Sequence, residues 1–142
     1  MLRFNSTARL STRLIVLTLL GASPFCWADT PQQFLTNYEQ TAKAQNPAFA
    51  GFSSETGNQF FNNKQGGEWS CASCHTNNPL TTGKHIVTNK IIQPLSPNAN
   101  SERFTDAAKV EKWFKRNCND VLKRECTAEE KGHVLSWLLS VK

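Results

Sequence analysis

The sequence Cys71-Ala-Ser-Cys74-His75 decides how the rest of this chain has to fold. Two thiols three residues apart lie about one helical turn from each other, so both can reach the two vinyl groups of a single haem. The next residue then places an imidazole under the iron as the proximal ligand. The motif therefore predicts one covalent haem c held by Cys71 and Cys74, with His75 on the iron.

Two other interpretations of the cysteine pair are less well supported. A redox dithiol enzyme would carry the motif in a βαβ unit, which the surrounding sequence lacks. A zinc site would need a second ligand pair, and only Cys118 and Cys126 are available, at an awkward separation. Haem attachment remains the favoured interpretation.

Residues 1–28 are predicted to be an export signal that is cleaved after Ala28. Three arginines precede an apolar stretch over residues 14–22, which is too short to span a bilayer. A lipoprotein signal that uses Cys26 is disfavoured by the residues before it. We therefore expect a periplasmic protein with one domain over residues 29–142.

The charge of the chain belongs largely to this signal. The net charge is +5, but three bases lie in residues 1–28 and all 11 acids lie beyond them, which leaves +2. This balance predicts no binding of nucleic acid or anionic membranes. No apolar stretch after residue 28 is long enough to cross a bilayer. In an oxidising compartment, Cys118 and Cys126 are expected to form a disulfide.

The remaining patterns predict an all-α fold. Thr30-Pro31 begins a helix that ends before Pro47, and Ser53 or Ser54 caps a short second helix. Thr105 is expected to cap a third helix. A capping box from Thr127 to Glu130 begins the last one.

Residues 76–103 show neither helical nor strand periodicity, so they are expected to form a long loop that wraps the cofactor. Lys84 and Arg103 are either partners of the haem propionates or solvated surface charges. The loop's apolar side chains are expected to pack on the porphyrin: Ile86, Val87, Ile91, Ile92 and Leu95.

The distal side of the iron is the open question. Met1, the only methionine, lies in the signal, so methionine cannot be the sixth ligand. His85 in the loop, His133, Asn117, a lysine or an open position remain. His133 lies at the edge of an apolar helical stripe, so an exposed, structural role is expected.

Asn117 shares a helical face with Val110, Trp113 and Phe114, where an unpaired amide costs about 1–3 kcal/mol. It is therefore expected either to ligate the iron or to cap the end of its helix.

Longer segments of the chain carry a resemblance to known proteins. They are CASCHTNNP (71–79), PLSP (94–97), RFTDAAKVEKWFKRNCND (103–120) and CTAEEK (126–131). They resemble small class I-like cytochromes of two related types: cytochrome c double-prime, which is bis-histidine when oxidised, and the oxygen-binding sphaeroides haem protein, which has a distal asparagine.

In both types the distal ligand directly precedes the first disulfide cysteine, which is the position of Asn117 before Cys118. The resemblance thus implies that Asn117 is the sixth ligand, that Cys118 and Cys126 are bonded, and that His85 and His133 are not ligands.

The expected function is electron transfer with a displaceable distal ligand, so that O2, NO or CO can bind ferrous haem. The family suggests a dihaem or membrane cytochrome as redox partner. A closed bis-histidine carrier that uses His85 is the first alternative. A small peroxidase, or an oxygen or nitric oxide reductase, ranks third, because no distal histidine and arginine pair is placed for O–O cleavage.

Overall fold

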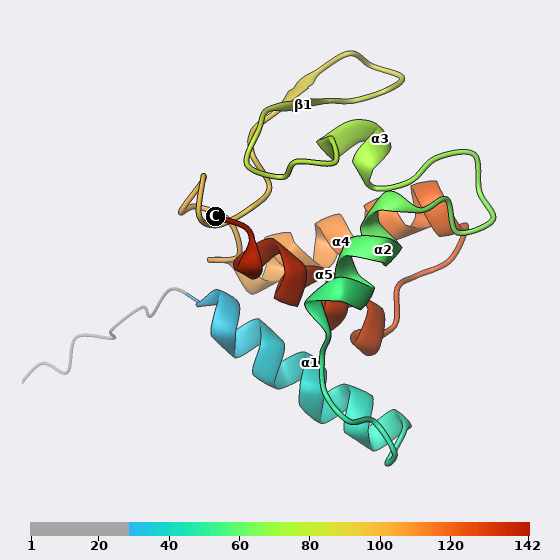
Figure 1. The fold of residues 1–142 in the computed structure, drawn as a ribbon, viewed down its shortest axis with the longest axis vertical. Coiled ribbons are helices and arrows are strands. Elements are labelled where there is room, and N and C mark those ends of the chain that lie inside the picture. The colour runs from blue at the N-terminus through green and yellow to red at the C-terminus, as the bar shows by residue number, and fades with distance from the viewer. Residues whose placement is uncertain (1–28) are drawn as a thin grey trace, which may run out of the picture.

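The computed structural model describes residues 29–142, so the predicted signal lies outside the described residues. Within this range none of the helices has the length and apolar character needed to cross a membrane. The elements in chain order are α1 (Pro31–Gln45), α2 (Ser54–Asn62), α3 (Ala72–His75), β1 (Gly83–Lys84), β2 (Ile91–Ile92), α4 (Ala107–Leu122) and α5 (Ala128–Ser140) (Figure 1). The predicted all-α fold is confirmed.

Three helices begin where the sequence predicts, because their capping residues act locally. The Thr30 hydroxyl accepts a hydrogen bond from the Gln33 amide at 3.3 Å, and the Thr30 amide donates one to the Gln33 side-chain oxygen at 2.9 Å. Ser53 caps α2, and Thr127 forms the predicted capping box with Glu130 at the start of α5. Each cap satisfies amides that the first helical turn leaves unpaired.

The start of α4 differs from its prediction. Its N-cap is Asp106, whose carboxylate accepts a hydrogen bond from the Lys109 amide at 3.0 Å. The predicted cap, Thr105, instead donates its hydroxyl to the Glu102 carbonyl. A carboxylate both caps the helix and interacts favourably with its dipole, which explains why Asp106 takes this position.

The loop over residues 76–103 contains a small antiparallel pairing that the sequence did not predict. Gly83 pairs with Ile92 and Lys84 with Ile91. Two residues on each side are too few to create an alternating pattern. The hairpin lies against α3, and a Cβ atom at Gly83 would lie 2.2 Å from the Cys74 carbonyl oxygen.

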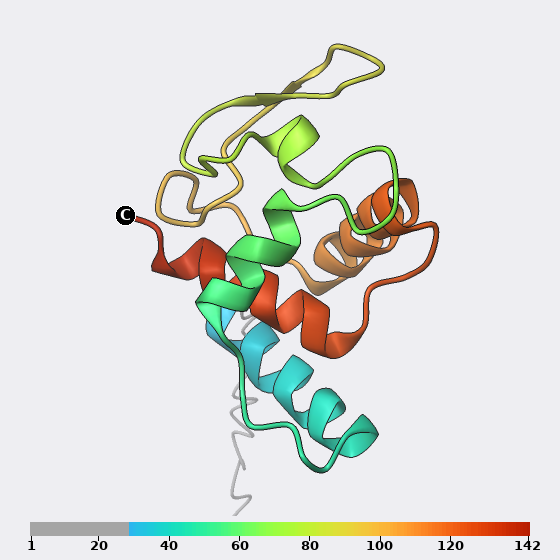
Figure 2. The ribbon, with the colours of Figure 1, turned by 45° about the vertical axis from the view of Figure 1, so that its right-hand side comes forward.

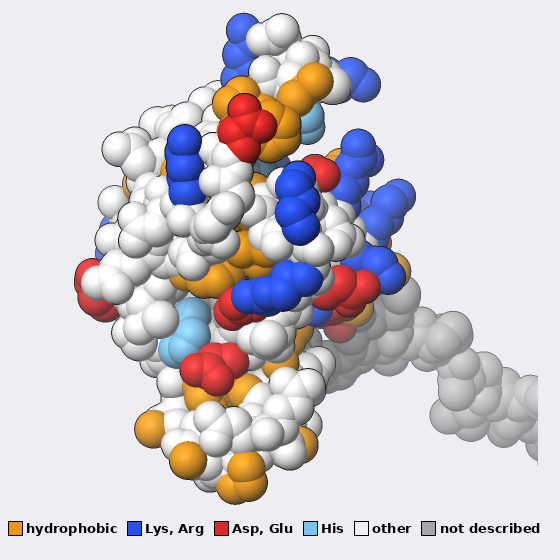
Figure 3. Space-filling model, turned by 90° about the vertical axis from the view of Figure 1, so that its right-hand side faces the viewer, with side chains coloured by type: hydrophobic (Ala, Val, Ile, Leu, Met, Phe, Trp, Pro, Cys, Tyr) orange, Lys and Arg blue, Asp and Glu red, His pale blue; other side chains and the backbone are white. Residues whose placement is uncertain are grey.

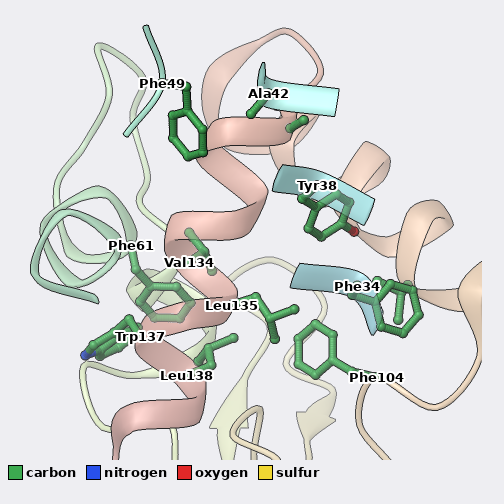
Figure 4. Close-up of a cluster of buried hydrophobic side chains, with 12 residues drawn as sticks. Phe34, Tyr38, Ala42, Phe49, Phe61, Phe104, Val134, Leu135, Trp137 and Leu138 are labelled. Carbon is green, nitrogen blue, oxygen red and sulfur yellow. The ribbon is translucent and has the colours of Figure 1, made fainter. Parts of the chain in front are cut away.

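Helix α5 is the centre of the hydrophobic core. It packs against α2 on one side and α1 on the other (Figures 1 and 4). The ring centroids of Phe61 from α2 and Trp137 from α5 are 4.8 Å apart. Leu135 and Leu138 are fully buried between the two neighbouring helices. This packing fixes α2, which leads into the cysteine motif.

His133 is buried, so the expectation that it is exposed was wrong. Its Nδ1 atom accepts a hydrogen bond from the Ser53 amide at 2.9 Å, and the rings of Phe49 and Phe52 pack edge-on against it. The segment before α2 covers this edge of α5, and helical periodicity cannot reveal such a long-range contact. The expected structural role of His133 fits these contacts.

Replacing Gly57 with alanine is expected to destabilise the folded protein strongly. A Cβ atom at Gly57 would lie 1.9 Å from the His133 carbonyl oxygen, so α2 and α5 would have to separate. We expect a loss of about 3 kcal/mol in the free energy of unfolding, measured by denaturant titration. The exposed control Gln59→Ala, on the same helix, should change stability little, and an equal loss in both variants would contradict the explanation.

Candidate functional site

Helix α3 brings Cys71, Cys74 and His75 together within one turn. The Cys71 carbonyl accepts hydrogen bonds from the amides of Cys74 and His75, at 3.2 and 3.1 Å. Both cysteines are half-buried free thiols. The turn ends at Thr76, whose φ of +63° reverses the chain toward the hairpin. The three predicted site residues are therefore adjacent in space as well as in sequence.

The buried Nδ1 atom of the His75 imidazole has no hydrogen-bond partner within residues 29–142. Burial, followed by the positive charges of Arg103 and His85, lowers the pKa of His75 to about 4. The ring is therefore neutral at neutral pH, which is the form that can donate a lone pair to a metal. The ring centroids of Phe61 and His75 are 6.2 Å apart, so the hydrophobic core extends to the site.

The thiols do not have the character of a redox enzyme. Burial, and to a smaller degree the neighbouring Cys74, raises the pKa of Cys71 to about 11. Reactive dithiols instead have a lowered thiol pKa. The zinc interpretation fails as well, because Cys118 and Cys126 are joined in a disulfide. Two free thiols beside an unpaired neutral imidazole fit a covalent haem, with Cys71 and Cys74 as attachment points and His75 as ligand.

The loop over residues 76–103 is held by hydrogen bonds of two residues, Arg103 and Ser96, that no sequence motif indicated. Arg103 donates its Nε to the Pro94 carbonyl at 2.9 Å and its Nη2 to the Gln93 carbonyl at 2.8 Å. Ser96, fully buried, donates its hydroxyl to the Leu138 carbonyl on α5 at 2.8 Å. Arg103 is therefore partly buried rather than a solvated surface charge.

The five loop side chains predicted to pack on the porphyrin differ in burial, and Ile92 is half-buried. Leu95 packs against the hydrophobic core. Ile86, Val87 and Ile91 are 45, 62 and 65% exposed, and their contact with the porphyrin stays a prediction. The amide of Ile86 lies 3.5 Å from the Cys74 sulfur, so the hairpin adjoins one thioether position. Figure 3 shows hydrophobic side chains visible between lysines and arginines on one face of the molecule.

His85 lies at the base of the hairpin turn. Its Nδ1 atom accepts hydrogen bonds from the amides of Val87 and Thr88, both at 3.2 Å. These bonds hold the ring against its own turn. They give the residue a local structural role that does not depend on the iron.

Asn117 lies inside α4, five residues before its end, so its predicted alternative role as a helix cap is wrong. The helix ends at Leu122, and Lys123 is the C-cap in the left-handed conformation. The side chain of Asn117 is half-buried and makes no hydrogen bond within the described residues. Its amide is therefore free to interact with a bound group. Trp113, one turn earlier, is 48% exposed, with the Arg116 guanidinium 5.6 Å from its ring centroid.

The predicted disulfide is present and begins directly after Asn117. Cys118 on α4 is joined to Cys126, with their Cα atoms 5.6 Å apart. Closing so short a loop in the unfolded chain contributes roughly 2–3 kcal/mol in the chain-entropy model. The bond also restrains the part of α4 that carries Asn117.

Comparison with known proteins gives three matches by sequence. A family described as a domain of unknown function (DUF1924) matches residues 47–138. Cytochrome c'' of Methylophilus methylotrophus is 43% identical over 126 residues, which are 86% of this chain and 88% of that protein. The cytochrome c-type protein SHP of Cereibacter sphaeroides is 42% identical over 132 residues, 89% of this chain and 97% of that protein.

Solved structures of these two kinds of cytochrome also match the fold of this chain. The crystal structure of oxidised cytochrome c'' has a TM-score of 0.71 at 41% identity and covers 79% of this chain and 94% of the other. Oxidised SHP, described as an oxygen-binding cytochrome c, has a TM-score of 0.66 at 38% identity, with coverage of 78% and 96%. Fold and site together thus define a c-type cytochrome, with covalently bound haem. The chain belongs to the family of cytochrome c'' and SHP.

Replacing both Cys71 and Cys74 with alanine is expected to abolish covalent haem attachment, because no other thiol is free within residues 29–142. The intact mass of the denatured protein measures this directly. The unaltered protein should retain one haem, each single variant should retain a haem through one thioether, and the double variant should retain none. Haem still attached in the double variant would contradict the assignment.

Proposed function

We propose that this protein is a periplasmic electron-transfer cytochrome in which Asn117 is a weak, displaceable distal ligand. Its displacement in the reduced protein lets O2, NO or CO bind. When bound, haem supplies reversible one-electron chemistry and a sixth coordination position for such a ligand. The observation that carries the proposal is the unpaired amide of Asn117 on α4, beside the disulfide.

The two axial positions differ in strength because their side chains differ. His75 offers a neutral imidazole, which is a strong donor to iron. Asn117 offers a neutral amide, which is a weak donor, especially after reduction has removed positive charge from the metal. A released amide retains N–H groups that can donate a hydrogen bond to a bound diatomic molecule.

The relatives support both the gas binding and the ligand displacement in this proposal. SHP is described as an oxygen-binding cytochrome c. The solution structure of cytochrome c'' is described as giving insight into haem-ligand detachment, and it matches this chain with a TM-score of 0.70. We extend these properties to the present chain because the distal position implied by the family is Asn117. The partner in electron transfer is proposed to be a dihaem or membrane cytochrome.

Periplasmic localisation rests on the sequence of residues 1–28 and on the chemistry of the cysteines. A disulfide between Cys118 and Cys126 persists in an oxidising compartment, and bacterial export delivers proteins to one. The localisation is therefore part of the proposal.

The test is a set of optical spectra of the haem-loaded protein, oxidised and dithionite-reduced, with and without CO. We expect the reduced protein to be high-spin and to bind CO. Asn117→Ala should convert the oxidised form from six-coordinate to a more open form. Asn117→His, which places a strong donor on the same helical position, should slow CO binding by roughly ten-fold or more.

Asn119→Ala is the matched control, because Asn119 is an exposed asparagine on the same helix. It should leave all spectra unchanged. A reduced protein that is low-spin and inert to CO would instead indicate a closed electron carrier. An oxidised spectrum unchanged by Asn117→Ala would show that another residue occupies the distal position.

A further inference from the structure

Helix α4 is attached to the molecule differently from the other long helices. Helices α1 and α2 pack extensively against α5, whereas α4 makes no comparable helix–helix contact within residues 29–142. Figure 2 shows α4 set to one side of α5 and joined to it by an extended connection. The position of α4, and hence of Asn117, therefore depends on a small number of side-chain contacts.

Besides the disulfide, these contacts include a cluster of three polar side chains from three helices, Tyr38, Glu111 and Lys131, called the Glu111 cluster below. The Tyr38 hydroxyl donates a hydrogen bond to one carboxylate oxygen of Glu111 at 2.5 Å. The Lys131 ammonium donates to the other oxygen at 2.6 Å. A single carboxylate on α4 thereby connects α1 and α5.

The Glu111 cluster is partly sheltered from solvent, because two of its three side chains are shielded while the Glu111 side chain itself is 46% exposed. Tyr38 is buried and the Lys131 side chain is only 16% exposed. The Lys131 ammonium also lies 5.6 Å from the Tyr38 ring centroid and 5.9 Å from that of Phe114. Charge-assisted hydrogen bonds are shorter and stronger than neutral ones, and the shielding of Lys131 reduces the screening of this pair relative to a pair that is exposed on both sides.

A second ion pair joins Lys115 on α4 to Glu125, which lies just before α5, with the charged atoms 2.8 Å apart. Its side chains are 66 and 57% exposed, so water screens the attraction. An exposed pair of this kind contributes little to holding a helix in place. The Lys115–Glu125 pair therefore serves as an exposed lysine–glutamate pair for comparison with the Glu111 cluster.

The Glu111 cluster lies near Asn117 along α4. Glu111 precedes Asn117 by six residues, which is about 9 Å along a rigid α-helix. Phe114 lies between them, and its ring packs edge-on against Tyr38 at 6.1 Å. On the other side of Asn117, the disulfide holds Cys118. Asn117 is thus bracketed by a polar contact before it and a covalent bond after it.

We propose that the Glu111 cluster positions α4 so that Asn117 meets the haem iron, and thereby sets the strength of the distal bond. This inference rests on the proposed function, since it takes Asn117 as the distal ligand. Tyr38, Glu111 and Lys131 are positioning residues, because they act through Asn117.

The test compares Glu111→Gln with Glu125→Gln in the haem-loaded protein. Glutamine at position 111 keeps an oxygen for the Tyr38 hydroxyl but loses the ionic hydrogen bond to Lys131. We expect the equilibrium between Asn117-bound and open oxidised protein to shift toward the open form by about five-fold, as read from the optical spectrum. Amide hydrogen exchange along α4 should accelerate to a similar degree. Glu125→Gln should change neither.

Two further variants separate positioning from general stability. Tyr38→Phe is nearly isosteric and removes only the hydroxyl, so it should shift the same equilibrium in the same direction without loss of haem. In an Asn117→Ala background, Glu111→Gln should have no further effect on the spectrum. A lowered melting temperature in Glu111→Gln and Tyr38→Phe with an unchanged ligation equilibrium would overturn the inference.

The outcomes also distinguish this inference from the proposed function. If Asn117→Ala alters the oxidised spectrum while Glu111→Gln and Tyr38→Phe do not, the function stands and the positioning role is wrong. If Glu111→Gln acts equally in the presence and absence of Asn117, the cluster does not work through that residue. If Asn117→Ala has no effect, both proposals are wrong.

Discussion

The close contact between α2 and α5 determines where the chemistry of this protein lies. At Gly57 the two helices approach so closely that a Cβ atom would overlap the His133 carbonyl oxygen. That approach packs the Phe61 ring against Trp137, and the Phe61 ring centroid also lies 6.2 Å from that of His75. The core is therefore continuous with the proximal side of the site. A rigid core of this kind holds the imidazole in one place, which a permanent metal ligand requires.

Helix α4, which carries Asn117, is held less extensively than α2. Helix α4 is joined to the rest through the Glu111 carboxylate, buried apolar side chains such as Val110 and Val121, and the disulfide at Cys118. Extensive interlocking of side chains, such as that between α2 and α5, resists displacement, whereas a few polar contacts allow small movements. In the proposed function, His75 is the fixed proximal ligand and Asn117 is the distal ligand on a less constrained helix, and this asymmetry suits a bond that has to break and form again.

The parts of the fold that could be predicted from sequence are those set by neighbours along the chain. Thr30, Ser53 and Thr127 cap their own helices, and the spacing of Cys71 and Cys74 is complete within one turn. The buried state of His133 and the Glu111 cluster could not be predicted, because each joins segments far apart in the sequence. Asn117 is an intermediate case. Its helical face was evident, but only the length of α4 excludes the capping role.

The two restraints on α4 differ in kind, and their order along the helix matters for the proposed displacement of Asn117. The disulfide is covalent and adjoins Asn117, so it limits how far that residue moves when α4 shifts. The Glu111 cluster is polar and lies about 9 Å away along the helix, so it can weaken and re-form. We therefore propose that a small shift of α4 near Glu111 acts on Asn117 chiefly by turning its side-chain amide. Metal coordination by an amide depends on the direction of its oxygen lone pairs, so in the proposed function a change in orientation would open the distal position while the helix remains folded.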